Sequence, residues 1–278
     1  MTIEIEKLHP LYAARIHGLD IRKPMGEATF AQIKEIAAQY VVCVIGHDAP
    51  PSNDEHIAFS AKFGPLQRGK APKISGTEIR IPHPEILDQS NLDEVGEIYS
   101  DDDRRLAYKR ANRLWHTDMS FYDVRATYSL LAAHLVPPSG ADTEFTDMRA
   151  VWEAIPDTRK REIEHLKVEH SYWYSRVLGG GPQPTEEERA TRPPACHPIV
   201  HLHAPSNRKA LYLASHAQNI VGWPENEGRA LIDELIAFAT QERFIYAHKW
   251  RLGDILIWDN LATCLLYTSP SPRDVEES

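Results

Sequence analysis

Short apolar segments typical of β-strands are scattered along the whole chain, and this arrangement constrains the fold more than any other feature. The candidates are residues 41–46, 126–140, 141–147, 209–215, 244–250 and 254–260. The last two flank the sequence RLGD, so we expect them to pair. Strands interrupted by helices indicate a mixed α+β fold, in which an antiparallel barrel or sandwich carries inserted helices.

Four segments have the apolar spacing of helices. They are residues 29–40, 53–64, 148–166 and 226–241. Ser52 or Asn53 is expected to cap the second helix and Gly64 to end it, and Pro156 should divide the third. Residues 65–112 are polar and predict a long irregular segment, and residues 179–194 predict a flexible surface connection.

Charge and composition exclude several classes of protein. The formal net charge is −9 and no run of Lys or Arg stands out, so a nucleic-acid partner has no electrostatic basis. No segment approaches the roughly 18 to 20 apolar residues that span a bilayer, and no signal peptide is evident. A small-molecule or protein partner fits the charge better. Three widely separated cysteines suit a reducing compartment, so we expect a cytoplasmic protein.

The sequence RLWHTDMSF, residues 113–121, contains the first candidate for metal chemistry. If this segment is a strand, His116 and Asp118 point to the same face and can bind one ion. A facial triad of two histidines and one carboxylate binds Fe(II) in non-haem oxygenases. The motif alone is weak, and by itself it favours a core or surface histidine that is hydrogen-bonded to Asp118 or to the backbone.

Four longer stretches carry a more specific signal. LWHTDMSF, VPPSGADTEFTDMRA, RKALYLASHAQNIVGWP and HKWRLGDILIWDN together resemble the taurine dioxygenase family of Fe(II)/2-oxoglutarate-dependent dioxygenases. The branch that looks most similar is the 2,4-dichlorophenoxyacetate type. This resemblance runs from the N-terminal region to about Thr263. It implies a double-stranded β-helix, or jelly-roll, core with flanking helices, and family members often self-associate.

The resemblance also assigns roles to particular residues. His116 and Asp118 become two of three iron ligands, and Thr143 would hydrogen-bond the distal carboxylate of 2-oxoglutarate. Trp258 would line the cosubstrate pocket, although it could also be a core aromatic residue. His203 and His216 match histidines near the substrate carboxylate, and a structural hydrogen-bonding role for these two remains an equal alternative.

The third iron ligand of the family has no counterpart in this chain. Leu265 stands where the second histidine belongs, and Arg273, the only late arginine, has no matching surroundings for a clamp on 2-oxoglutarate. CLLYTSPSPRD reverse-translates to a sequence that resembles a sequencing-library adapter. Real divergence is one explanation. We expect the other, in which residues 1–263 are one incomplete dioxygenase domain lacking its last strand or strands and residues 264–278 are a non-native tail. Resequencing the source locus beyond codon 263 tests this.

The expected reaction is hydroxylation of a small carboxylic acid by Fe(II), 2-oxoglutarate and dioxygen. For an aryloxyalkanoate, it breaks the ether and gives a phenol, succinate and CO2. The incomplete ligand set predicts little or no turnover by the chain as it stands. The alternatives are a taurine-like sulfonate dioxygenase and a non-catalytic jelly roll that binds a small acid. The natural substrate and its stereochemistry cannot be read from the sequence.

Overall fold

The computed structural model describes residues 2–68, 80–93, 95–100, 110–138 and 140–268. Its largest sheet has five strands in the order β1-β2-β3-β12-β4. These strands are β1 Glu4–Lys7, β2 Ala14–His17, β3 Val42–Ile45, β12 Ile255–Asp259 and β4 Tyr128–Ala132. Only β2 and β3 pair in parallel within this sheet. We call it the first sheet.

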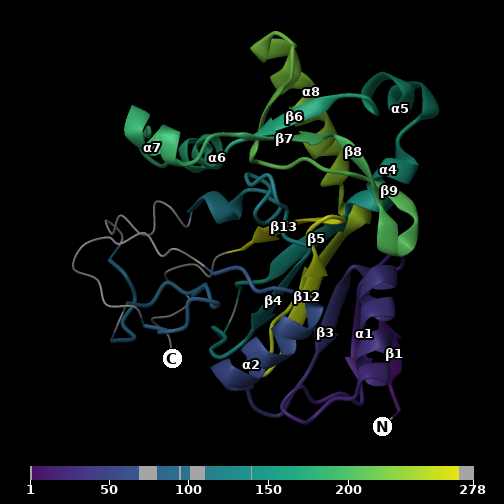
Figure 1. Cartoon of the computed structure of the whole chain (residues 1–278), viewed down its shortest axis with the longest axis vertical. Helices are drawn as coiled ribbons and strands as arrows, with labels where there is room; N and C mark the ends of the chain where they lie inside the picture. Colours follow the sequence, from purple (N-terminus) through teal and green to yellow (C-terminus); the bar gives the residue numbers. More distant parts are fainter. Residues whose placement is uncertain (1, 69–79, 94, 101–109, 139, 269–278) are drawn as a thin grey trace.

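A second sheet contains β11 Ile245–His248, β5 Thr143–Asp147 and β13 Thr263–Tyr267, with β5 in the centre. Apolar side chains from both sheets form one buried cluster that includes Val44, Leu256 and Trp258 from the first sheet and Phe145 and Leu265 from the second. Two sheets that enclose a shared core confirm the predicted jelly roll. Figure 1 shows these strands in the middle of the molecule.

The predicted pairing between residues 244–250 and 254–260 is wrong. Strand β11 pairs with β5, whereas β12 pairs with β3 and β4. Gly253 has φ of +83°, and its N–H donates to the Ala133 carbonyl at the end of β4. The short connection therefore carries the chain from one sheet to the other instead of closing a hairpin.

Two N-terminal helices cover the outer face of the first sheet (Figure 1). They are α1 Glu27–Tyr40 and α2 Asn53–Ser60, and a short 3-10 helix, η1 Ala61–Phe63, extends α2. The Ser52 hydroxyl accepts from the Glu55 N–H while the Glu55 carboxylate accepts from the Ser52 N–H. This reciprocal capping box shows that Ser52, one of the two predicted candidates, caps α2.

A third layer lies beyond the second sheet. It contains α4 Met148–Ala154, α5 Asp157–Ile163, β6 Lys167–His170, α6 Tyr172–Leu178, α7 Glu186–Thr191, β7 Ala195–Pro198, β8 Val200–His203, β9 Arg208–Leu211, β10 Ala217–Ile220 and α8 Glu225–Ala239. Three further 3-10 helices are η2 Ala111–Arg113, η3 Ala204–Ser206 and η4 Glu242–Phe244. Pro156 separates α4 from α5 as predicted, but α7 shows that residues 179–194 are not simply a flexible connection.

Much of the predicted irregular segment, residues 65–112, lies outside the described residues. Within the described ranges, no helix combines the length and the apolar character that are needed to cross a membrane. Residues 264–267, which the sequence assigns to the tail, form most of β13. Their apolar run suits a strand, because the tail prolines come only at 270 and 272.

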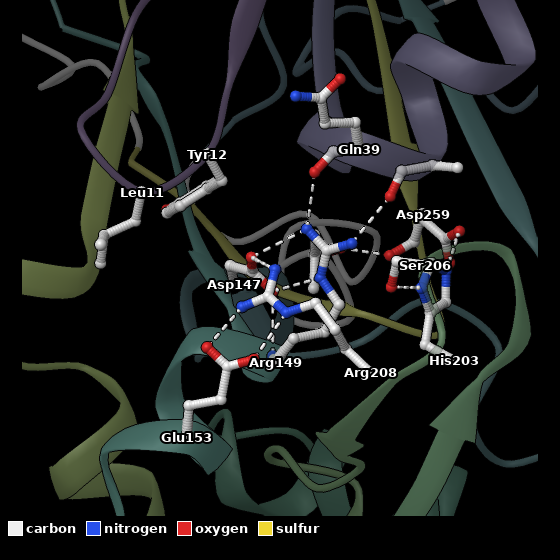
Figure 2. A network of polar contacts seen from close by, with 12 residues as sticks. Leu11, Tyr12, Gln39, Asp147, Arg149, Glu153, His203, Ser206, Arg208 and Asp259 are labelled. Atoms are coloured by element: carbon white, nitrogen blue, oxygen red, sulfur yellow. Dashed lines mark hydrogen bonds and ion pairs between the residues drawn. The ribbon is translucent and has the colours of Figure 1, made fainter.

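A buried ion pair joins α4 to the end of α1 (Figure 2). The Arg149 guanidinium donates to both carboxylate oxygens of Asp147, at 3.0 and 2.9 Å. It also donates to the carbonyls of Ala38 and Gln39, at 2.7 and 2.9 Å. Both charged side chains are fully buried, and the cation lies at the negative end of the α1 dipole.

Replacement of Arg149 by methionine should lower the free energy of unfolding by about 3 to 5 kcal/mol, because Asp147 loses its buried partner. Arg159→Met is the matched control, since Arg159 pairs with Glu162 and Glu234 at the surface and should cost at most about 1 kcal/mol. Urea unfolding measures both. Equal losses for the two variants would contradict this account.

His170 on β6 predicts a pH-dependent stability. Burial, followed by the charges of His197 and Arg125, lowers the pKa of His170 from 6.5 to about 3. As pH falls below about 6.5, His170 therefore becomes protonated in the unfolded chain but stays neutral in the folded chain. Stability from this residue is present at neutral pH and is lost in acid.

Between pH 6 and pH 4, the free energy of unfolding should fall by about 2 kcal/mol more in the parent chain than in His170→Leu. Urea titrations at several pH values measure the difference. Parallel pH profiles for the two chains would show that His170 does not contribute.

Candidate functional site

The HTD motif lies where the two sheets of the jelly roll meet. His116 forms an isolated bridge with Leu265 of β13, in which each N–H donates to the other carbonyl at 2.8 and 2.7 Å. The predicted strand is wrong beyond this point, because residues 118–121 form a turn and Met119 has φ of +62°. The backbone bends away after His116, so strand alternation does not set the direction of Asp118.

His116 and Asp118 nevertheless face each other. His116 Nε2 lies 3.6 Å from Asp118 Oδ1. His116 Nδ1 lies 2.8 Å from the Leu114 carbonyl, which can only accept, so Nδ1 carries the hydrogen and Nε2 keeps its lone pair. Burial lowers the pKa of His116, against the opposing effect of the Asp118 carboxylate. A neutral imidazole beside a carboxylate suits a divalent cation.

The first sheet orients the Asp118 carboxylate. Ser129 of β4 donates to Asp118 Oδ2 at 2.8 Å, and Asn260 Nδ2 donates to the Ser129 hydroxyl at 2.8 Å. Trp258 lies directly across the ladder from Ser129. Ser129 and Asn260 were not predicted as site residues, although Asn260 belongs to the WDN sequence that carried part of the resemblance.

The donors present do not complete a metal site. Among the described ranges, no group of three or more His, Cys, Asp or Glu side chains is arranged to hold a metal ion. Leu265 is the backbone partner of His116, so its side chain shares the His116 face. It is fully buried in the cluster between the sheets. A leucine therefore stands beside the two donors, and Arg273 lies outside the described residues.

Thr143 and Trp258 lie in the same interior. The Thr143 hydroxyl is buried and accepts from the Trp250 indole at 2.9 Å. Thr143 pairs with Tyr267 of β13, whose ring lies 5.5 Å from the His116 ring. Trp258 packs against Phe145 at 5.6 Å. Tyr267 was not predicted as a site residue, because the family pattern gives no role to a tyrosine at this position.

The two histidines that were expected near the substrate have different surroundings. His203 Nε2 lies 2.9 Å from Asp259 Oδ2, and its Nδ1 lies 2.6 Å from the Ser206 hydroxyl (Figure 2). Both of its nitrogens already have protein partners, which favours the structural alternative for His203. In contrast, neither ring nitrogen of His216 has a hydrogen-bond partner in the part of the chain that the structure describes.

His216 is close to the candidate metal donors. Its ring centroid lies 6.4 Å from that of His116 and 5.0 Å from that of Phe121. Burial, followed by the nearby charges of His116, Arg176 and His170, lowers the pKa of His216 well below its usual value. The neutral ring can donate one hydrogen bond and accept another.

Known proteins resemble this chain over nearly its whole length. Residues 4–264 match the family model "Taurine catabolism dioxygenase TauD, TfdA family". The alpha-ketoglutarate-dependent 2,4-dichlorophenoxyacetate dioxygenase of Cupriavidus pinatubonensis is 40% identical over 267 residues, which cover 96% of this chain and 92% of that protein. The (S)-phenoxypropionate/alpha-ketoglutarate-dioxygenase of Sphingobium herbicidovorans is 29% identical over 284 residues, which cover 99% and 92%.

A solved structure shares the whole fold. AAD-2 in complex with Mn(II) and N-oxalylglycine has a TM-score of 0.90 and 36% identity, with coverage of 98% of this chain and 93% of that chain. These findings confirm the predicted family, enzyme class and fold, and with them the Fe(II), 2-oxoglutarate and dioxygen on which the family depends. The chain belongs to the TauD, TfdA family of dioxygenases.

Proposed function

We propose that this fold serves the ether cleavage of an aryloxyalkanoate acid, with 2-oxoglutarate and dioxygen as cosubstrates and Fe(II) as the metal. When bound, iron and 2-oxoglutarate would supply, with dioxygen, the oxidising chemistry that hydroxylates the carbon beside the ether oxygen. The hydroxylated ether then collapses, so that an aryloxyacetate gives a phenol, glyoxylate, succinate and CO2. The observation that carries this proposal is the 40% identity to a 2,4-dichlorophenoxyacetate dioxygenase over nearly both full lengths.

His116 and Asp118 are the proposed metal ligands. Their 3.6 Å separation is supporting geometry, since two ligands about 2.1 Å from one ion lie about 3 to 3.5 Å apart. The Leu114 carbonyl fixes the imidazole and Ser129 fixes the carboxylate. Both ligands are thus held before a metal arrives.

Thr143 and Trp258 are the proposed cosubstrate contacts. Because the Thr143 oxygen accepts from Trp250, its own hydrogen remains available to donate to a carboxylate. Trp258 supports the same region, since it pairs with Ser129 and packs on Phe145.

His216 is the proposed partner of the substrate carboxylate. It is buried beside His116, and as a neutral ring it can donate an N–H to the anion. Phe121 packs on His216 at 5.0 Å and on Tyr172 at 5.1 Å, which brings aromatic surface next to the donor. An aryloxy acid presents the same combination of an anion and an aromatic ring. We do not extend this role to His203, whose nitrogens both have protein partners.

Two other functions have an observation in their favour. The description of the matching family model mentions taurine, which favours a sulfonate substrate. The incomplete donor set beside Leu265 favours a non-catalytic jelly roll that binds a small acid. Anaerobic addition of Fe(II) and 2-oxoglutarate separates the enzyme from the binding protein, because only the enzyme develops a visible charge-transfer band.

We further propose that the protein acts in the cytoplasm without a nucleic-acid or membrane partner. The net charge of −9 disfavours nucleic acid. The cysteines Cys43, Cys196 and Cys264 are free thiols, as a reducing compartment favours.

The substrate class is tested with a chain that carries two substitutions. Leu265→His supplies the missing histidine, and Tyr267→Ala removes the ring beside His116 and Thr143. The chain is supplied with Fe(II) and millimolar 2-oxoglutarate. We expect phenol release from 2,4-dichlorophenoxyacetate and no sulfite from taurine. The same chain with His116→Ala in addition is the control and should release no phenol. Sulfite from taurine without phenol would favour the sulfonate dioxygenase instead.

The parent chain, which has Leu265, should turn over slower than about 0.1 s⁻¹, against about 10 s⁻¹ for a typical enzyme. Two protein donors hold iron weakly, and the described residues form no group of three His, Cys, Asp or Glu donors. An oxygen electrode with Fe(II), 2-oxoglutarate and 2,4-dichlorophenoxyacetate measures the rate. Robust 2-oxoglutarate-dependent oxygen uptake by this chain would contradict the conclusion that its set of iron ligands is incomplete.

A further inference from the structure

Strand β13 presents two side chains to the His116–Asp118 pair. Leu265 pairs with Phe145 and Tyr267 pairs with Thr143 across the second sheet. Because side chains alternate along a strand, Leu265 and Tyr267 share the inner face. Cys264 packs in a different cluster, beyond the second sheet, which agrees with this alternation.

Leu265 stands where a third donor could reach the same ion. It is hydrogen-bonded to His116 through both backbone groups, and side chains of such opposed residues lie about 5 Å apart at Cβ. Its side chain is 0% exposed and consists only of hydrocarbon. The side of the His116–Asp118 pair that faces β13 is therefore covered by a side chain that cannot bind a metal ion.

Tyr267 is a neighbour of both His116 and Thr143. Its ring centroid is 5.5 Å from that of His116, and its backbone lies opposite Thr143 in the ladder. Tyr267 is thus next to one proposed metal ligand, His116, and opposite Thr143, the proposed contact for the cosubstrate.

We propose that Leu265 and Tyr267 act as a plug that excludes a divalent cation and a keto acid from the His116–Asp118 edge. Leu265 provides no third ligand atom, and Tyr267 occupies the volume next to Thr143. One substitution, Leu265→His, completes a set of two imidazoles and one carboxylate. A second, Tyr267→Ala, opens the adjoining space. This inference rests on the proposed function for the roles of His116 and Asp118 as metal ligands and of Thr143 as the contact for the keto acid.

Mn(II) binding to the full-length chain tests the role of Leu265. We expect Leu265→His to bind Mn(II) at least 100-fold more tightly than the parent chain by calorimetry, with the gain lost when His116→Ala is added. Leu266→His is the matched control, because residue 266 faces the opposite side of β13 and should bring no gain. The plug is overturned if Leu265→His does not bind, or if Leu266→His binds equally well.

A second pair of variants keeps the test decisive if histidine at 265 disturbs folding. Cysteine is small and apolar enough for a core position. With Co(II), Leu265→Cys should show the absorption of a metal-bound thiolate, whereas Leu266→Cys should not. Thiolate absorption in both variants or in neither would overturn the proposal. Circular dichroism confirms that each chain is folded.

N-oxalylglycine tests the role of Tyr267. In the Leu265→His chain loaded with Mn(II), adding Tyr267→Ala should tighten N-oxalylglycine binding at least 10-fold, and adding Leu266→Ala should not. Unchanged affinity would remove Tyr267 from the plug. None of these measurements needs a substrate. A chain that binds Mn(II) and N-oxalylglycine but releases no phenol would therefore refute the proposed function and leave the plug intact.

Discussion

The backbone pairing of His116 with Leu265 is the interaction on which the candidate site depends. Two hydrogen bonds of 2.8 and 2.7 Å attach the HTD segment to the second sheet. Thr117 adds a third connection to this sheet, because its hydroxyl donates to the Thr263 carbonyl at 3.0 Å. The Asp118 carboxylate is held from the other side by Ser129 of the first sheet. The motif therefore bridges the two sheets, and both donors are fixed by protein groups.

The buried histidines fall into two kinds, and hydrogen bonding separates them. His203 satisfies both nitrogens within the protein, through Asp259 and Ser206. His197 accounts for its Nε2 with the carbonyls of Ser120 and Tyr122. His216 and His170 instead leave both nitrogens without a hydrogen-bond partner among the described residues, and His216 is the one whose ring contacts His116. A buried polar group without a partner is costly, which makes His216 the better candidate for contact with a ligand.

Local patterns in the sequence predicted the elements better than their partners. The helices α1 and α2, a cap at Ser52 or Asn53 and the break at Pro156 follow from short-range rules, and the structure confirms them with Ser52 as the cap. The pairing of β11 and β12 was predicted wrongly, because a short connection can either close a hairpin or cross between sheets. In the structure β12 is buried along its whole length and lies between β3 and β4.

For the candidate site too, the sequence predicted individual residues better than their contacts. The family resemblance selected His116, Asp118 and Thr143, and the structure brings the side chains of the first two together and links Thr143 to them through Tyr267. The family resemblance could not distinguish His203 from His216, because these two histidines differ in their contacts with residues far away in the chain. Tyr267 was missed because its effect comes from where β13 places a ring and not from a motif.

The central claim is that β13 places the inward side chains of residues 265 and 267 against His116. Nuclear Overhauser effects in the parent chain test this directly. The account predicts cross-peaks between the rings of Tyr267 and His116, whose centroids are 5.5 Å apart. Cross-peaks from His116 to Leu266 in place of Tyr267 would show that β13 is shifted in register, and would contradict the account.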